Sequence, residues 1–292
     1  MQGDWSQYTD EQRYQAILNK YENKAHLAGK THDSIKFVRA LRKNKKQSSP
    51  NYYHVILEGL SVLEAALRYQ IELTNLFICP TDIYSSYARN TLEQAANKAL
   101  NSFIVTKKVF QLISAKDNSN GLLAIAKIPK NQLTDILKNK PQIVVVLDGL
   151  ETPGNIGSII RTADAINAQA IIITNRKAKL YHPMMVRSSR GACFKYPIID
   201  TTVEQASEFL LSHNYELVLA DTDATEYHYE HQYSQRVALI MGSERFGIAN
   251  DWYKPQHSKI AIPMYGDCDS LNVSVATSIL LYEIRLKLNK LK

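Results

Sequence analysis

The chain has 292 residues, of which 45% are hydrophobic, which is typical of globular proteins and leaves room for two domains. Its formal charge of +7 favours a polyanionic partner such as nucleic acid. No stretch reaches the roughly 18 uninterrupted apolar residues of a membrane helix, and we expect no signal peptide. The three widely separated cysteines form no metal-binding pair and indicate reduced thiols, so we expect a cytoplasmic protein without a metal.

The first 46 residues are predicted to form a helical extension and a basic helix. Residues 1–30 read as an extension in which Thr9 caps a polar helix. In residues 35–46, apolar side chains recur at helical spacing, and basic side chains gather toward the end of the helix. Part of this charge suits the helix dipole, but six cations without an acid favour contact with RNA phosphates over a merely solvated face. The candidate RNA-binding residues are Arg39, Arg42, Lys43, Lys45 and Lys46.

Short apolar runs then alternate with helical patterns up to about residue 130. Strands are predicted at 54–57, 76–79, 102–105 and 121–128, with helices between them at 60–69, 91–100 and 107–113. This alternation predicts a small α/β domain over residues 31–130. Residues 131–141 are expected to be a linker that contains a short polar helix.

The second half, residues 142–292, reads as a parallel α/β domain. Residues 143–147 are continuously apolar, as expected of a central strand covered on both faces. Further strands are predicted at 169–174, 196–199, 217–220, 237–241 and 260–264, with helices at 158–166, 203–213 and at the C-terminal end. The Gly-rich dinucleotide and P-loop motifs and the HExxH zinc motif are absent, and His228 and His231 fall in a polar loop segment.

Three segments, each following a predicted strand, carry the chemically informative residues. Residues 155–163 read NIGSIIRTA, residues 241–247 read MGSERFG and residues 270–276 read SLNVSVA. Ligands of open α/β sheets bind beyond the carboxyl ends of the strands, where these segments lie. The third segment alternates like a strand but runs into a helical pattern, so a serine that merely caps the last helix is an equally good interpretation of it alone.

Together, in this order, the three segments resemble the motifs of the SpoU/TrmH family of RNA ribose 2′-O-methyltransferases, within the SPOUT superfamily. The resemblance covers residues 142–288 and implies a deep trefoil knot, S-adenosylmethionine as methyl donor and a homodimer. More loosely, the first half resembles the L30e-like substrate-binding domain of family members that act on ribosomal RNA. The expected fold is therefore an L30e-like α/β domain followed by an α/β SPOUT domain.

The resemblance also assigns roles to single residues. Gly242, Ile262 and Leu271 match positions that contact the cofactor through the main chain. Arg161 matches an arginine proposed to activate the hydroxyl. Because a guanidinium holds its proton too tightly to act as a general base, we favour a role as phosphate clamp and oxyanion donor. Glu244 is expected to pair with Arg161 or to fix a loop. The alternative interpretations are a surface acid for Glu244 and a turn residue for Asn155. The matched catalytic positions are Asn155, Arg161, Glu244, Ser270 and Asn272.

The resulting hypothesis is an S-adenosylmethionine-dependent 2′-O-methyltransferase of ribosomal RNA. A tRNA 2′-O-methyltransferase, a base methyltransferase and a non-catalytic RNA-binding or ribosome-assembly protein remain alternatives. Arg245 departs from the family pattern, in which a small residue follows the glutamate. A long cation there can reach an RNA phosphate or a partner subunit.

Overall fold

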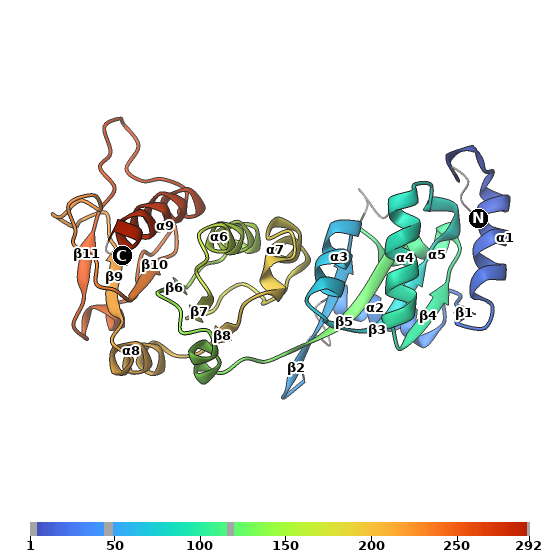
Figure 1. The fold of residues 1–292 in the computed structure, drawn as a ribbon, viewed down its shortest axis with the longest axis horizontal. Helices are drawn as coiled ribbons and strands as arrows, with labels where there is room; N and C mark the ends of the chain where they lie inside the picture. Colours follow the sequence, from blue (N-terminus) through green and yellow to red (C-terminus); the bar gives the residue numbers. More distant parts are fainter. Residues whose placement is uncertain (1–4, 44–48, 116–119, 291–292) are drawn as a thin grey trace. The chain divides into compact units, whose positions relative to one another are not determined.

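The computed structural model divides the chain into two compact units, residues 1–130 and residues 131–292 (Figure 1). It describes residues 5–43, 49–115 and 120–290, so Lys45 and Lys46 lie outside the described residues. Within these ranges, no helix combines the length and apolar character needed to cross a membrane. The predicted α/β class is confirmed, and each unit is built on its own sheet.

Unit 1 is a five-stranded mixed sheet in the order β1-β4-β3-β5-β2. Strands β1, β4 and β3 are parallel, whereas β5 runs antiparallel to both β3 and β2. The strands are β1 (Ala25–Leu27), β2 (Tyr52–Glu58), β3 (Glu72–Ile78), β4 (Asn101–Ile104) and β5 (Leu122–Pro129). The helices are α1 (Asp10–Tyr21), α2 (Asp33–Arg42), α3 (Leu60–Arg68), α4 (Ser86–Lys98) and α5 (Lys107–Ile113), with short 3₁₀ turns η1 (Trp5–Gln7) and η2 (Pro80–Asp82).

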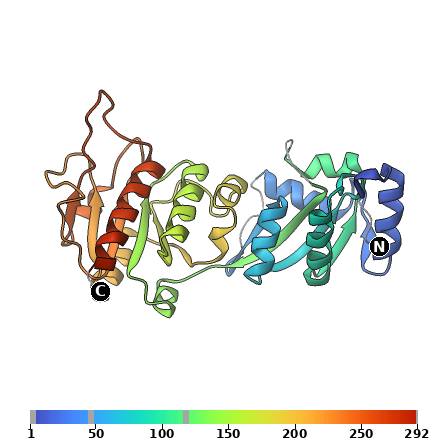
Figure 2. The same cartoon turned by 45° about the horizontal axis from the view of Figure 1, so that its top comes forward.

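Apolar residues of both sheet and helices hold unit 1 together. On one face, Val38 of α2 and Phe110 of α5 pack with Phe77 and Ile125 of the sheet in a buried cluster. Helices α3 and α4 contact each other and lie on the other face (Figures 1 and 2). Consecutive residues of β3, β4 and β5 are buried because both faces of the sheet are covered, which explains why these strands read as short apolar runs.

The N-terminal helix α1 is fixed to unit 1 by a buried arginine. Thr9 caps the helix as predicted, in a capping box with Gln12. Arg13 is 6% exposed, and its guanidinium donates to the carbonyl oxygens of Thr81 (3.2 Å) and Trp5 (3.3 Å). The bond to Thr81 attaches the extension to η2, so the extension is part of the unit. The short strand β1 was not predicted.

Unit 2 is a six-stranded parallel sheet in the order β11-β9-β10-β6-β7-β8. Its strands are β6 (Ile143–Asp148), β7 (Ala170–Thr174), β8 (Ile198–Asp200), β9 (Glu216–Ala220), β10 (Val237–Met241) and β11 (Ser258–Ile260). Its helices are α6 (Pro153–Ala165), α7 (Pro183–Ser188), α8 (Val203–Ser212) and α9 (Val273–Lys290), with 3₁₀ turns η3 (Leu133–Lys138), η4 (Ala192–Phe194) and η5 (Asn250–Tyr253). Helices α6, α7 and α9 lie on one side and α8 on the other (Figure 1).

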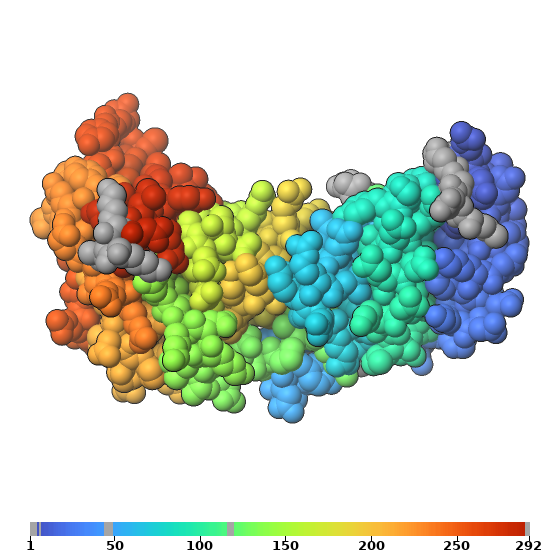
Figure 3. Space-filling model, in the orientation of Figure 1, coloured from blue at the N-terminus to red at the C-terminus, as the bar shows by residue number. Residues whose placement is uncertain are grey.

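Both faces of this sheet are covered, which accounts for the uninterrupted apolar run of β6. Val144 and Val146 pack with Leu210 of α8 and the fully buried Trp252 of η5. Alternate residues of β6 point to the opposite face, toward α6 and α9. The surface of α9 adjoins that of α6 in Figure 3, and the Thr162 and Ser278 hydroxyls meet at 3.0 Å between these helices.

Several element boundaries differ from those predicted, and the start of α6 and the end of β11 are among them. Helix α6 begins at Pro153 instead of residue 158, because a proline suits the first helical position, where its missing N–H has no intrahelical partner. Strand β11 ends at Ile260, whereas a strand over 260–264 was expected. Helix α9 begins at Val273, inside the string where the alternating pattern runs into the helical one, so residues 270–272 are loop and residues 273–276 begin the helix.

Candidate functional site

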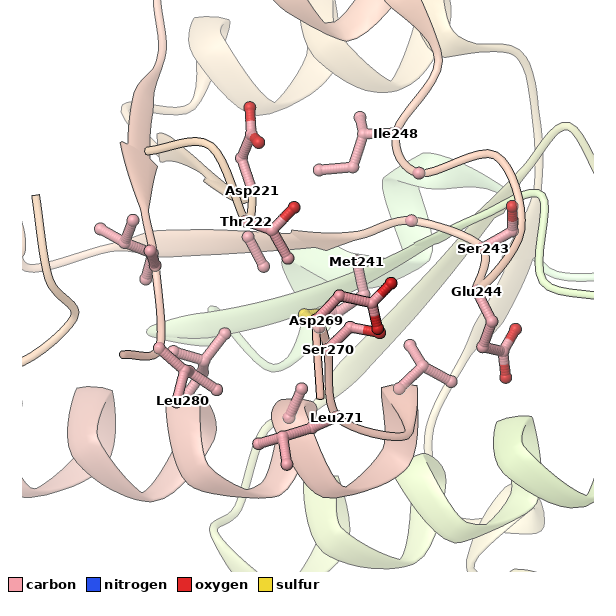
Figure 4. Close-up of a pocket in the computed structure, with 18 of the residues that line it drawn as sticks. Asp221, Thr222, Met241, Ser243, Glu244, Ile248, Asp269, Ser270, Leu271 and Leu280 are labelled. Atoms are coloured by element: carbon pink, nitrogen blue, oxygen red, sulfur yellow. The ribbon is translucent and has the colours of Figure 1, made fainter. Parts of the chain in front are cut away.

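A pocket opens beyond the carboxyl ends of β9, β10 and β11 and against the start of α9. Its volume is about 340 Å³, and we call it the strand-end pocket. Figure 4 shows Asp221 and Thr222 on the loop after β9, Ser243 and Glu244 on the loop after β10, and Leu280 on α9. The lining residues therefore come from segments that are distant in sequence and meet because parallel strands end at one edge of the sheet.

Five of the residues singled out from the sequence line this pocket: Gly242, Glu244, Ile262, Ser270 and Leu271. At Gly242, an added Cβ would lie 2.2 Å from the carbonyl carbon of Gly247 and 2.4 Å from the nitrogen of Ile248. These are backbone atoms that a small side-chain movement cannot relieve. A glycine at position 242 therefore keeps the loop folded closely on itself at the pocket wall.

Asn155, Glu244 and Asn272 form one hydrogen-bonded group, which we call the asparagine–glutamate network. The amide nitrogen of Asn155 donates to the Glu244 carboxylate, and the amide nitrogen of Asn272 lies 3.5 Å from the amide oxygen of Asn155. The Asn272 amide oxygen accepts from the Ser274 nitrogen at 3.0 Å, which is the bond of a helix N-cap. The residue that caps α9 is thus Asn272 and not a serine.

Arg161 lies apart from the network. It borders a separate hollow with Ser158, Thr162, Ser188 and Tyr282, and it does not line the strand-end pocket. Arg161 follows Asn155 by six positions on α6, which places the two side chains about 120° apart around the helix axis. Among the described residues, Arg161 makes no ion pair; the expected pairing of Glu244 with Arg161 is therefore replaced by the bond from Asn155.

The predicted RNA-binding cations of unit 1 divide into two kinds. Arg39 and Lys43 are exposed on and just after α2. Arg42 instead pairs at 2.5 Å with Glu58, a carboxylate only 8% exposed, which also accepts from the Ala115 nitrogen at 2.7 Å. Because removing one partner would leave a buried charge, Arg42 acts within unit 1 as a structural residue.

Asp221 was missed from the sequence. It follows β9 at the wall of the strand-end pocket, and its carboxylate accepts from the Tyr253 hydroxyl at 2.9 Å. Burial, followed by this bond, raises the pKa of Tyr253 to about 12. The carboxylate retains lone pairs for ligand hydroxyls. The sequence did contain a signal, because Asp221 directly follows a predicted strand. We applied the rule that ligands bind beyond the carboxyl ends of the strands only to the three motif segments.

Asp148 was also missed, and it connects the strand ends beneath the site. It is 2% exposed at the end of β6 and accepts from the Thr174 hydroxyl (2.8 Å), the Asn175 amide (2.7 Å) and the backbone nitrogen of Ala249 (2.7 Å). The last bond fixes the end of the loop that carries Glu244. Three donors compensate the burial of one carboxylate.

The remaining titratable clusters have internal partners. His231, 7% exposed, lies between the carboxylates of Glu216 (2.7 Å) and Glu226 (3.0 Å). No group of side chains in the described part of the chain could hold a metal ion. Burial raises the pKa of Cys79 to about 11 and that of Cys193 to about 12, whereas Cys268 is exposed on the loop before α9.

Two family models match the chain. The model described as the SpoU rRNA Methylase family matches residues 142–282, and the one described as the MRM3-like substrate binding domain matches residues 32–124. The curated relatives include the 23S rRNA (guanosine(2553)-2′-O)-methyltransferase RlmP of Bacillus subtilis, 22% identical over 86% of this chain and 95% of the relative. They also include the 23S rRNA (guanosine-2′-O-)-methyltransferase RlmB of Haemophilus influenzae, 35% identical over 55% of this chain and 67% of the relative.

Solved structures share the fold over most of the chain. The AdoMet-bound rRNA methyltransferase from Sinorhizobium meliloti superposes with a TM-score of 0.78 at 25% identity, over 89% of this chain and 97% of that chain. The SpoU methyltransferase AviRb from Streptomyces viridochromogenes in complex with AdoMet gives a TM-score of 0.77 at 25% identity, over 88% and 98%.

Replacing Asp148 by asparagine should destabilise unit 2, because an amide N–H₂ then faces one of the three donors. We expect a loss of about 1–3 kcal/mol. The measurement is urea unfolding followed by the fluorescence of Trp252 in a Trp5→Phe background, where Trp252 is the one remaining tryptophan. Asp251→Asn, which removes an exposed partner of Lys254, is the matched control and should change stability by less than about 0.5 kcal/mol. Equal effects of the two substitutions would contradict the role of Asp148.

Proposed function

Because the chain belongs to the SpoU rRNA methylase family, we propose that it transfers a methyl group from S-adenosylmethionine to a ribose 2′-hydroxyl of ribosomal RNA. The observation that carries this proposal is the asparagine–glutamate network. It joins Asn155, Glu244 and Asn272, one residue from each motif segment, beside a pocket that Glu244 itself lines. The relatives named above are 23S rRNA 2′-O-methyltransferases, which supports ribosomal RNA as the substrate.

The strand-end pocket fits S-adenosylmethionine in size and in chemistry. Its volume lies in the range of small-molecule sites, and Gly242 gives a wall of bare backbone that a Cβ would close. Met241 and Leu280 supply apolar surface for a base, and the Asp221 carboxylate can accept from ribose hydroxyls. We assign main-chain contacts with this cofactor to Gly242, Ile262 and Leu271. When bound, S-adenosylmethionine supplies an electrophilic methyl group on its sulfonium.

The protein's own groups must orient the ribose and stabilise the charge that develops on its oxygen. Glu244 holds the Asn155 amide in one orientation, and Ser270 and Asn272 offer further hydrogen-bonding groups near it. We assign these four residues to orientation of the reacting sugar. A guanidinium remains charged throughout, so we assign Arg161 to clamping an RNA phosphate and stabilising the oxyanion.

A homodimer is part of the proposal, because α9 carries an unpartnered apolar row. Val275, Ile279, Tyr282 and Leu286 are 47%, 37%, 50% and 56% exposed, and their spacing puts them on one side of the helix. We call this row the α9 stripe. Tyr282 also borders the hollow of Arg161. A second copy seated on the stripe would therefore enclose Arg161, which accounts for its distance from the pocket of its own chain.

Further parts of the proposal follow from the family. We propose that residues 31–130 form an L30e-like RNA-binding domain with residues 1–30 as its extension, joined through residues 131–141 to a methyltransferase domain over 142–292. We also propose that this last domain contains a deep trefoil knot and that the enzyme works in the cytoplasm. The knot is tested by an experimental density map, since a trace that can be drawn out into an unknotted line would contradict it.

Purified protein should transfer labelled methyl groups from S-adenosylmethionine to ribosomal RNA and leave the label in an alkali-resistant dinucleotide. Arg161→Ala should lower transfer by at least about 10²-fold, since one lost oxyanion donor costs roughly 2.7–4 kcal/mol. The affinity of the Arg161→Ala variant for S-adenosylmethionine, measured by calorimetry, should be unchanged. Label found only in a base would contradict the ribose as the target, and label found only with tRNA would contradict ribosomal RNA as the substrate. RNA binding without any methyl transfer would indicate a non-catalytic RNA-binding protein.

The exposed cations of α2 should contribute to RNA affinity. Arg39→Gln combined with Lys43→Gln should weaken RNA binding and reduce the slope of log K against log salt by about 1 for each lost phosphate contact. Filter binding across a salt series measures both. Lys36→Gln is the matched control on the same helix, because Lys36 is already paired with Asp33 at 2.9 Å. If the double variant behaves like this control, α2 is a solvated face.

A charge on the α9 stripe should disrupt the dimer. Ile279→Glu should convert the dimer to a monomer and abolish methyl transfer, because burying a lone carboxylate in an interface is costly. Size-exclusion chromatography with light scattering gives the mass directly. Leu211→Glu is the control: Leu211 is also 37% exposed, but it lies on α8 at the opposite face of the sheet. A wild-type monomer, or an Ile279→Glu dimer, would refute this interface.

A further inference from the structure

Arg245 and Phe246 lie at the rim of the strand-end pocket, and neither of them belongs to the asparagine–glutamate network. Phe246 is 69% exposed, and Arg245 is exposed beside it. The Arg245 guanidinium lies 5.0 Å from the centre of the Phe246 ring, and within the described residues it pairs with no carboxylate. Their two sequence neighbours, Glu244 and Gly247, both line the pocket.

The loop that carries this pair has a fixed shape. The backbone nitrogens of Ser243 and Gly247 each donate to the carbonyl oxygen of the other at 3.0 Å, and the Ser243 hydroxyl accepts from the Phe246 nitrogen at 3.0 Å. Gly247 adopts a φ of +66°, which glycine tolerates. Asp148 fixes the far end of the loop through Ala249. Little conformational entropy thus remains to be lost when a ligand meets the pair.

The chemistry of the pair fits a nucleotide. The guanidinium lies over one face of the ring, which leaves the other face available for a planar base. RNA bases that are unpaired stack on aromatic rings and on guanidinium planes, and arginine also binds phosphate through two parallel hydrogen bonds. A protein partner with an apolar surface fits this pair poorly, because it would bury the Arg245 cation without a counter-charge.

We propose that Arg245 and Phe246 form a nucleotide clamp that holds an unpaired neighbour of the methylated nucleotide. Phe246 stacks on the base of that neighbour, and Arg245 binds its phosphate. The clamp lies next to Glu244, so it positions the adjoining ribose at the asparagine–glutamate network. This inference rests on the proposed function, because it requires an RNA substrate at the strand-end pocket.

The test compares Phe246→Leu, Phe246→Trp and Arg245→Gln with wild type in single-turnover methylation and RNA binding. Phe246→Leu should weaken RNA binding roughly 10-fold, and Phe246→Trp should restore it, because stacking needs an aromatic face. Arg245→Gln should reduce the salt slope by about 1. Lys254→Gln is the cation control, since Lys254 already pairs with Asp251 at 2.6 Å. Affinity for S-adenosylmethionine should stay within 2-fold in all four variants.

Unchanged RNA binding in both Phe246→Leu and Arg245→Gln would overturn the clamp, as would a leucine variant that binds RNA as well as the tryptophan variant. A shift of Phe246→Leu from dimer to monomer would also overturn it, because the ring would then belong to a subunit interface. Failure of the proposed function is separate and visible beforehand: the wild-type protein would then neither bind nor methylate RNA.

Discussion

Asp148 ends the central strand of the second sheet with a carboxylate that accepts hydrogen bonds from β7, from the turn after β7 and from the loop after β10. Such a charge is stable in the interior only while its donors stay in place. The path of the loop after β10 therefore depends on it. Through that loop, the position of Glu244 beside Asn155 depends on it as well, so core and site share one set of constraints.

Local patterns predicted most of the sheet of unit 2. Strand β10 has the predicted bounds, and β6 extends only one residue further, because a strand covered on both faces leaves an uninterrupted apolar run. At residues 270–276 the strand-like alternation overlaps a helical pattern, and the helix begins inside this string, at Val273. There Asn272 caps α9, and a cap followed by a helix can alternate by chance over a few residues.

Contacts between residues that are distant in the chain could not be predicted from the sequence. Arg42 looked like its basic neighbours until the fold brought Glu58 against it, sixteen residues away. No residue near Asp221 in the sequence indicated its hydrogen bond with Tyr253, which lies on η5. Arg161 and Asn155 share a motif, yet the early start of α6 at Pro153 puts both on one helix and turns them to different sides. The motif residues could be listed from the sequence, but their partners could not.

The cysteines have a practical consequence. Cys79 and Cys193 are buried, and their raised pKa keeps them as unreactive thiols, whereas Cys268 is exposed. Cys268 immediately precedes Asp269 and Ser270 at the wall of the strand-end pocket. A maleimide dye added to the unaltered chain would therefore attach at one point, beside the pocket. The native protein thus carries its own attachment site for a fluorescent reporter of events at the pocket, without any engineered cysteine.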